Sequence, residues 1–303
     1  MPVIEVNGLT KDYGHGRGIF DISLNVEKGV CYGFLGPNGA GKTTTIRHLM
    51  GFSKPQRGTA VISGCDCWNH ATELKTQIGY LPGEIAFPKG LTGTEFLNMQ
   101  MKMRGVTDDT YLKELLKRFE LDSAMNVDKM SLGVRRKLAV VTAFIHDPSI
   151  LILDEPTSGL DPVMQQCFID FILAEKKRGK TILLSSHIFH EVDATCDRIS
   201  IIKDGKIVAD FVADELKKRS SKIYRVTFGD KESFDRFTSL DYTFHSKNEK
   251  KMRARVVIPT EQINRLLLDI SELNVMDFQE IVFTLEDYFM EFYKNDHVFE
   301  EVR

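Results

Sequence analysis

Eight consecutive residues near position 40 have the types and the order that can hold a phosphate group. They are Gly36-Pro37-Asn38-Gly39-Ala40-Gly41-Lys42-Thr43, which fits the pattern G-x-x-x-x-G-K-[ST]. Glycines allow successive backbone N–H groups to turn toward phosphate oxygens without a clash from Cβ atoms. Lys42 can reach the outer phosphates, and the Thr43 hydroxyl can bind Mg²⁺. The run therefore predicts a site for ATP or GTP with a magnesium ion.

The segments on either side of this run fit the same chemistry. Residues 30–35 are apolar and predict a strand, and the chain continues from Thr44 to Met50 as a helix. The N-terminus of a helix carries partial positive charge and free N–H groups, which attract an anion. An ordinary glycine-rich turn is the alternative interpretation, and the motifs further along the chain weigh against it.

Two adjacent carboxylates follow a second apolar run. Residues 150–153 predict a buried strand, and Asp154 and Glu155 come directly after them. A buried strand can hold Asp154 beside the phosphate loop, where it can bind Mg²⁺ directly or through water. Glu155 points elsewhere and can orient or activate a water molecule in line with the last phosphate. Such a pair is common at strand ends, and its position after a phosphate loop makes it a candidate for catalysis.

Composition limits the class of protein. The chain has 303 residues, 42% hydrophobic and 27% charged, with a net charge of −3, so we expect an ordinary globular protein and no dedicated nucleic-acid binder. No apolar run approaches the length of a membrane span, and the N-terminus does not have the pattern of a signal peptide. The five cysteines form no metal-binding pattern. We therefore expect reduced thiols and a cytoplasmic location.

Alternating segments predict an α/β core over residues 1–215. Continuous apolar runs at 30–35, 150–153, 181–184 and 198–202 are typical of buried parallel strands. Helical periodicity recurs between them, and ligands of such sheets lie at the carboxyl ends of the strands. The stretch from about 87 to 147 is mostly helical, with segments at 93–104, 109–120 and 131–146. It predicts a helical subdomain inserted in the core.

The composition of the chain changes near residue 215, where a polar and basic segment begins. Residues 216–303 predict a small α+β domain with the order βαββαβ, which is the order of a ferredoxin-like domain. The expected elements are strand 222–228, helix 231–239, strands 241–246 and 252–258, helix 260–270, strand 274–284 and a last helix near 285–294. Apolar residues at positions 285, 288, 289 and 292 form a stripe that indicates core packing.

The ordered set of motifs from Tyr13 to His187 resembles the nucleotide-binding subunit of an ATP-binding cassette (ABC) transporter. Residues 36–43 resemble its Walker A motif and residues 150–155 its Walker B motif. Ser158-Gly159-Leu160-Asp161 resemble the D-loop, so Asp161 is expected near the nucleotide. The resemblance also implies that Tyr13 stacks on adenine, which favours ATP over GTP. His187, in Leu183-Leu184-Ser185-Ser186-His187, would contact the γ-phosphate as the switch histidine.

The segment Met130-Ser131-Leu132-Gly133-Val134-Arg135-Arg136-Lys137 corresponds to the signature motif of that family. Ser131 precedes an amphipathic helix, so its hydroxyl and the free N–H groups of the first turn can bind an anion. The same molecule already has one phosphate loop. The resemblance implies that two subunits, identical or different, pair head to tail, so that Ser131 and Gly133 complete the site built on Lys42 of the other chain.

Two departures from the family pattern concern the site. Leu132 and Val134 replace a glycine and a glutamine of the signature motif. In Ile78-Gly79-Tyr80-Leu81-Pro82-Gly83-Glu84, the position of the usual metal-binding glutamine aligns with Gly83, which has no side chain. Glu84 can supply a metal ligand from the next position, and a water molecule is the alternative. Similar variants occur in the branch of the family that exports antibiotics, drugs or lipids.

The resemblance implies an ATPase subunit that dimerises on ATP binding and powers a separate transmembrane permease, with export as the expected direction. The subunit would be cytoplasmic and held on the inner face of the membrane through the permease. A soluble ABC ATPase that acts in DNA repair or translation is the alternative. The basic segment 247–255 could contact nucleic acid, but it more simply predicts a solvated hairpin. A third interpretation makes residues 216–303 an accessory or regulatory domain.

Overall fold

The computed structural model describes residues 2–217, 221–281 and 284–293 of the chain. Contacts between residues divide the chain into two compact units, Met1–Ala213 and Asp214–Arg303. The sequence-based boundary lies two residues further along, after residue 215. Among the described residues, no helix combines the length and the apolar character required to cross a lipid bilayer.

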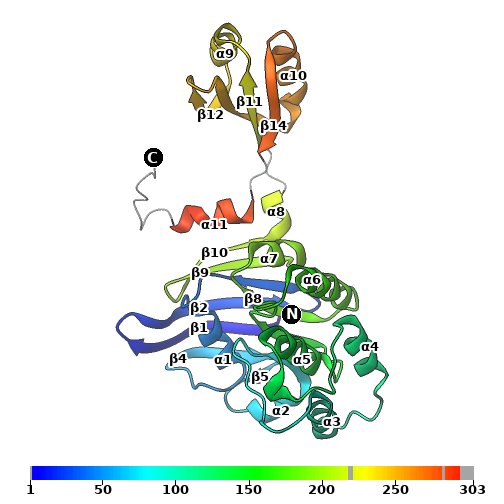
Figure 1. Cartoon of the computed structure of the whole chain (residues 1–303). Coiled ribbons are helices and arrows are strands. Elements are labelled where there is room, and N and C mark those ends of the chain that lie inside the picture. The colour runs from blue at the N-terminus through cyan, green and yellow to red at the C-terminus, as the bar shows by residue number, and fades with distance from the viewer. Residues whose placement is uncertain (1, 218–220, 282–283, 294–303) are drawn as a thin grey trace. The chain divides into compact units, whose positions relative to one another are not determined.

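The first unit contains a six-stranded central sheet in the order β10-β9-β3-β8-β7-β6 (Figure 1). Its strands are β3 (Cys31–Leu35), β6 (Ile78–Leu81), β7 (Ile150–Asp154), β8 (Thr181–Ser186), β9 (Arg198–Lys203) and β10 (Lys206–Val212). All neighbours are parallel except β9 and β10. Leu35 pairs with Ser186 and Asp154 pairs with Ser185, so the carboxyl ends of β3, β7 and β8 meet at one edge.

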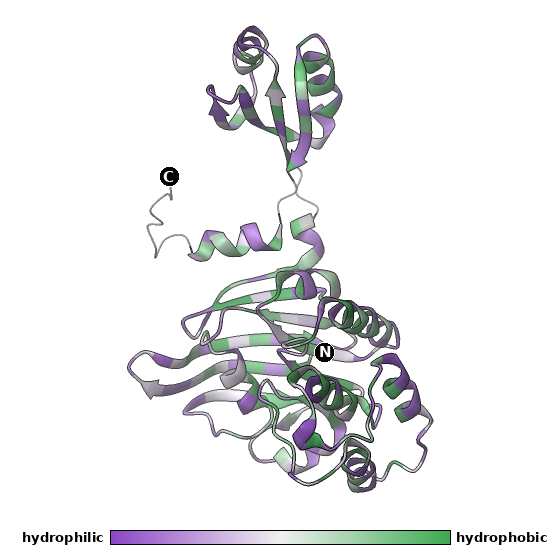
Figure 2. Cartoon of the chain, viewed as in Figure 1, coloured by the Kyte–Doolittle hydropathy of each residue, from purple (hydrophilic) through white to green (hydrophobic). Residues whose placement is uncertain are grey.

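The central strands are buried along their whole length, as their apolar sequences predict. Every residue of β3, β7 and β8 is buried. In Figure 2 the helices around the central sheet carry both the hydrophobic and the hydrophilic colour. Three of those helices are α1 (Lys42–Leu49), α6 (Pro162–Lys177) and α7 (Phe189–Thr195). Burial on both faces explains why the strand sequences are continuous and apolar rather than alternating.

A second, four-stranded sheet of the first unit has the order β2-β1-β4-β5 and antiparallel pairing. Its strands are β1 (Pro2–Gly14), β2 (Arg17–Glu27), β4 (Arg57–Ile62) and β5 (Cys65–Asp66), and the short helix α2 (Ala71–Gln77) follows β5. Side chains of β1 and β2 alternate between buried and exposed over much of their length. Their apolar face shares one core cluster with residues of the central sheet. The sequence interpretation did not identify this sheet.

Between β6 and β7 the described chain is helical, as predicted. It contains α3 (Gly93–Met103), α4 (Thr110–Arg118), a short 3-10 helix η1 (Val127–Lys129) and α5 (Leu132–Phe144). A single β-bridge joins Thr92 and Asn126. Thr92 and Glu95 form a reciprocal capping box at the start of α3. These helices belong to the first compact unit, and their status as a separate subdomain stays a prediction.

The second unit has the predicted order of elements, βαββαβ. They are β11 (Ser221–Phe228), α9 (Lys231–Thr238), β12 (Thr243–Asn248), β13 (Arg253–Pro259), η2 (Thr260–Gln262), α10 (Ile263–Ser271) and β14 (Val275–Ile281), with α8 (Ala213–Lys217) before them and α11 (Leu285–Tyr293) after them. The antiparallel sheet has the order β12-β13-β11-β14, and its core includes Val226, Phe237 and Leu266. Its assignment to the ferredoxin-like class stays a prediction. Leu285 and Phe289 of α11 are buried, whereas Tyr288 and Phe292 are half-buried.

Candidate functional site

The phosphate-loop residues turn tightly between the end of β3 and the start of α1. Gly39 and Gly41 have φ angles of 84° and 113°, which residues with a Cβ atom rarely adopt. At Gly36 an added Cβ atom would lie 2.6 Å from the Ile202 carbonyl oxygen. The loop can therefore take this path only with glycine at these positions, and it ends at the N-terminus of α1.

Lys42 lies inside the turn and connects it to the end of β7. Its side chain is only 5% exposed. Its ammonium group donates to the carbonyl oxygens of Gly36 at 2.5 Å and Pro37 at 3.1 Å. It also forms an ion pair with Glu155, with 2.9 Å between Nζ and Oε1. One cation is thus held between the phosphate loop and the second predicted carboxylate.

Glu155 joins Lys42 to His187. Its other carboxylate oxygen, Oε2, lies 2.6 Å from Nδ1 of His187. Glu155 also has a φ angle of 50°, an uncommon backbone conformation for a residue other than glycine, and its N–H donates to the Ser185 carbonyl at 3.0 Å. The fold therefore fixes both the backbone and the carboxylate of this residue. Three predicted catalytic residues lie in one connected row.

Asp154 is fully buried at the end of β7, and its carboxylate accepts a hydrogen bond from the Ser185 hydroxyl. Burial raises the pKa of Asp154 above its usual value, while hydrogen bonds from Ser185 and Thr43 act in the opposite direction. Among the described residues, Oδ2 of Asp154 has no hydrogen-bond partner. A buried carboxylate oxygen near the Thr43 hydroxyl is the donor set that suits Mg²⁺. The residues present therefore fit the predicted metal.

A cavity of about 610 Å³ opens beside these side chains. It is lined by residues of the phosphate loop, of α1, of β6 and of the loops that follow α1, β6, β7 and β8: Asn38, Thr43, Arg47, Phe52, Tyr80, Pro82, Gly83, Glu84, Glu155, Ser158 and His187. Five predicted site residues are thus brought to one cavity. Gly83 lies next to Asp154, since an added Cβ atom would be 3.0 Å from Oδ2. Glu84 is exposed at the wall, so its metal-binding role stays a prediction.

Tyr13 and Asp161 do not line this cavity. The Tyr13 ring is 55% exposed near the end of β1, with the Lys11 ammonium 5.9 Å from its centre. Asp161 caps α6, because its Oδ1 accepts a hydrogen bond from the Met164 N–H at 3.0 Å. This capping bond explains Asp161 without a nucleotide. The nucleotide contacts of both residues stay predictions.

Ser131 and Gly133 lie at the start of α5 and also do not line the cavity. The Ser131 hydroxyl accepts a hydrogen bond from the Val134 N–H at 3.3 Å and caps the helix. Ser131 is exposed, and an added Cβ atom at Gly133 would be 3.1 Å from the Gly159 carbonyl oxygen. Leu132, which stands where the family has glycine, is 64% exposed. This segment is accessible to a second molecule.

Sequence reasoning did not identify the roles of two buried charged residues. Arg136 of α5 is 3% exposed and donates to backbone carbonyls of two loops that border the cavity. Glu191 of α7 is 2% exposed and accepts from the Ser186 hydroxyl at 2.6 Å. Burial raises the pKa of Glu191 to about 7. The mostly apolar segment from Leu138 to Ile145 could have predicted the burial of Arg136, because it indicates a helix that is buried on most sides.

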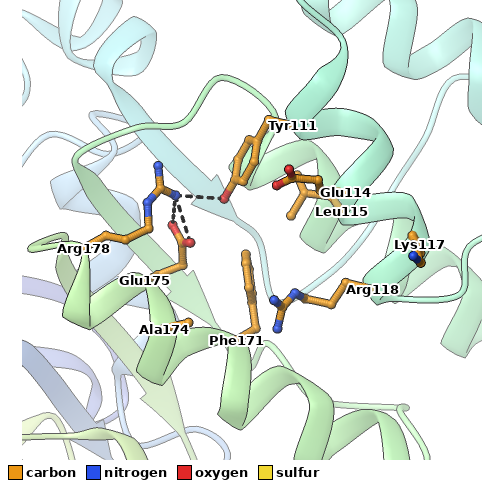
Figure 3. A pocket seen from close by; sticks show the side chains of 9 residues that line it. All are labelled: Tyr111, Glu114, Leu115, Lys117, Arg118, Phe171, Ala174, Glu175 and Arg178. Atoms are coloured by element: carbon orange, nitrogen blue, oxygen red, sulfur yellow. Dashed lines mark hydrogen bonds and ion pairs between the residues drawn. The ribbon is translucent and has the colours of Figure 1, made fainter.

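A second cavity, of about 730 Å³, lies between α4 and α6 (Figure 3). Glu175 of α6 accepts two 2.9 Å hydrogen bonds from Arg178, and Arg178 points toward the Tyr111 hydroxyl of α4 (Figure 3). Lys180 pairs with Glu175 at 2.9 Å. None of the predicted site residues lines this cavity. Its charged groups form a network that connects the helical region to the core.

Known proteins are similar to this chain in sequence and in fold. A family model described as ABC transporter matches residues 19–158. The bacitracin transport ATP-binding protein BcrA of Bacillus licheniformis is 33% identical over 95% of this chain and 96% of that protein. The daunorubicin/doxorubicin resistance ATP-binding protein DrrA of Streptomyces peucetius is 33% identical over 95% of this chain and 91% of that protein. A structure of an ATP binding subunit of an ABC transporter is 29% identical, with a TM-score of 0.65 over 72% of this chain and 92% of that chain.

The parallel sheet, the glycine turn at its edge and the carboxylates at the end of β7 define a phosphate-loop ATP-binding protein. The similarity to relatives over more than nine tenths of their length identifies the family within this class. The chain belongs to the family of ABC transporter ATP-binding subunits.

Proposed function

We propose that the chain hydrolyses ATP to ADP and phosphate and that this reaction powers export by a separate transmembrane permease. The row Lys42–Glu155–His187 carries the proposal, because it places a cation, a candidate base and an imidazole beside the glycine turn. The names of two relatives, which refer to bacitracin transport and to daunorubicin/doxorubicin resistance, support export of a compound of that kind.

In this proposal, backbone N–H groups of residues 36–43 and the Lys42 ammonium hold the phosphates. Thr43 and Asp154 would hold Mg²⁺, which neutralises negative charge on the phosphates when it is bound. Glu155 orients a water molecule and accepts its proton as the water oxygen attacks the γ-phosphorus. The bond from that phosphorus to the β-γ bridging oxygen then breaks. His187 holds the Glu155 carboxylate in position, and its imidazole can contact the released phosphate.

The proposal includes a dimer in which each site uses residues of both subunits. Ser131 and Gly133 present a capped helix N-terminus that does not line the cavity of their own chain. Such a terminus can bind the γ-phosphate held by another subunit. Tyr13, which is exposed, would stack on adenine. The second subunit is identical or a related ATP-binding chain, and one chain alone would hydrolyse ATP poorly.

The proposed location is the inner face of the cell membrane, through contact with the permease. Membership in a family of transporter subunits supports this location. The second compact unit would be an accessory or regulatory domain of the ferredoxin-like class. No observation on the described residues favours the alternative of a soluble ATPase that acts on nucleic acid or in translation.

Co-purification tests the proposed function. We expect the tagged chain to be recovered from detergent-solubilised membranes with a polytopic membrane protein, and the complex to hydrolyse ATP. Lys42→Ala should abolish ATP binding and hydrolysis, because it removes the cation from the phosphate loop. Recovery of ribosomes or DNA in place of a membrane protein would support the alternative. Unchanged ATP affinity in Lys42→Ala would contradict the phosphate-loop assignment.

A further inference from the structure

Arg136 connects α5 to two separate loops through backbone carbonyl groups. Its Nε donates to the Ser158 carbonyl oxygen at 3.0 Å. Its Nη1 donates to Pro82 at 3.1 Å and its Nη2 to Gly83 at 2.8 Å. Pro82 and Gly83 follow β6, and Ser158 lies in the loop after β7. One planar side chain thus holds two loops that are far apart in the sequence.

These hydrogen bonds serve a purpose in the fold itself. Among the described residues, none of the three carbonyl oxygens accepts a hydrogen bond from a backbone N–H. A buried cation without partners is destabilising. Arg136 is 3% exposed, so the three bonds supply the partners that its cation needs. Arg136 is therefore fixed in position more firmly than a surface arginine.

All three acceptor residues line the 610 Å³ cavity. A Cβ atom added at Gly83 would lie 3.0 Å from the buried Oδ2 of Asp154, so Gly83 is close to this carboxylate. The Ser158 N–H donates to the Glu155 carbonyl oxygen at 3.2 Å. Arg136 therefore holds the part of the cavity wall that lies beside Asp154, the candidate metal ligand. It also holds the backbone turn from Glu155, the candidate base, to Ser158.

We propose that Arg136 is a positioning residue that sets the active geometry of this site by holding Pro82, Gly83 and Ser158. The inference rests on the proposed ATPase function. Arg136 does not line the cavity, so it acts through the two loops and not by contact with ATP. The shape of the guanidinium matters as well as its charge, because a lysine at this position has one nitrogen in place of three and cannot reach both loops in the same way.

The test compares Arg136→Lys and Arg136→Met with Arg104→Lys in the full chain purified with its permease. Arg104 is the control, because it lies in the first unit, is half-buried and also donates to a backbone carbonyl, that of Lys75, away from the cavity. Three experiments are carried out. The first measures the affinity for a fluorescent ATP analogue, and the second measures kcat, KM and the Mg²⁺ concentration for half-maximal rate. The third measures amide hydrogen exchange in residues 82–92 and 155–161.

In both Arg136 variants we expect kcat to fall by about ten-fold or more and the Mg²⁺ requirement to rise, while affinity for the analogue stays within about three-fold of the unchanged chain. Amide exchange should become faster in the two loops. Arg104→Lys should change none of these quantities. A loss of stability alone would lower the fraction of active protein, and it would change neither the Mg²⁺ requirement nor exchange confined to these loops.

Other outcomes would overturn the inference. Unchanged kcat, Mg²⁺ requirement and loop exchange in the Arg136 variants would show that the loops hold their positions without Arg136. Normal behaviour of Arg136→Lys together with loss in Arg136→Met would show that positive charge, and not the three hydrogen bonds, is what matters. If the unchanged chain neither binds the analogue nor hydrolyses ATP, the proposed function itself fails. If it does both and the variants match it, only the inference about Arg136 fails.

Discussion

At the scale of single residues, Glu155 combines the features expected of a catalytic carboxylate. It pairs with Lys42 through one oxygen and with His187 through the other, and its backbone has a φ angle of 50°. An uncommon backbone conformation persists where the surrounding structure holds it, and such residues are frequent at functional sites. Asp154, one residue earlier, is fully buried and points to a different environment. The two adjacent carboxylates therefore lie in different environments.

Glu155→Gln should reduce ATP hydrolysis by about a hundred-fold or more, because an amide cannot accept a proton from water. ATP binding should persist, since Lys42 and the glycine turn are unchanged. We therefore expect the variant to accumulate as an ATP-bound dimer, measured by size-exclusion chromatography with ATP and Mg²⁺. Persistence of a monomer under these conditions would count against the two-subunit site.

Glu191 predicts a dependence of stability on pH. Burial raises its pKa from 4.5 to about 7; Glu155 acts in the same direction, and hydrogen bonds from Ser186 and Thr157 and the charge of Arg136 oppose it. Because the pKa is higher in the folded state, the stabilising contribution is complete below pH 4.5 and is lost as the pH rises through about 7.

Glu191→Gln should therefore melt at a higher temperature than the unchanged chain above pH 7, by a few degrees. The gain should shrink toward pH 5, where the glutamate is protonated and resembles glutamine. Thermal unfolding at pH 5, 6, 7 and 8 measures this difference. A difference in Tm that stays constant over the whole pH range would rule out titration of Glu191 as its cause.

At the scale of elements, parallel strand pairing brings the site together. β3, β7 and β8 end at the same edge of the sheet, so the residues that follow them face one cavity although they are far apart in the chain. Residues at the carboxyl ends of parallel strands are therefore available to one ligand. The helices α4 and α6 are connected by hydrogen bonds among Tyr111, Glu175 and Arg178 (Figure 3). Lys180 adds an ion pair with Glu175.

Arg178→Met should destabilise the first unit by about 1–2 kcal/mol, because the buried Glu175 carboxylate loses two hydrogen bonds and keeps Lys180 as its cation. Urea unfolding measures the change, and we expect ATP affinity to stay the same. Lys177→Met is the control, since Lys177 is exposed on the same helix. Equal stability of the two variants would show that the network contributes little.

At the scale of the whole molecule, the two segments proposed to bind phosphate do not line the same cavity. The glycine turn with Lys42 borders the cavity, whereas Ser131 caps α5 at an exposed position that does not line it. Two chains arranged head to tail would bring Lys42 of each to Ser131 of the other. Such an arrangement makes activity a property of a pair of subunits.

Mixing two inactive variants tests this arrangement. Lys42→Ala and Ser131→Ala should each have low ATPase activity, because every site in either homodimer lacks one residue. In a mixed dimer, Lys42 of the Ser131→Ala chain meets Ser131 of the Lys42→Ala chain, so one site is intact. We expect the rate of an equimolar mixture to exceed the mean of the separate rates. A rate equal to that mean, in a mixture where exchange of subunits is demonstrated, would contradict the paired site.

The sequence by itself determined the glycine turn, the carboxylates at the end of β7 and the central strands, because each depends on residues close together in the chain. Glycines at positions 36, 39 and 41 indicate a tight turn, and a continuous apolar run indicates a buried strand. The order of elements in the second unit was also predicted, because periodicity is local information.

Only the tertiary structure decided which of these residues share one cavity. It showed that Asp161 caps a helix, that Gly83 lies against Asp154, and that Arg136 binds carbonyl groups of two loops. The pairing of β1 with β4 also became visible only there, because its partners, such as Ile4 and Ile62, are far apart in the chain. Burial and hydrogen bonding of a charged side chain depend on neighbours that are distant in the chain. The spacing of residues along one segment therefore cannot reveal them.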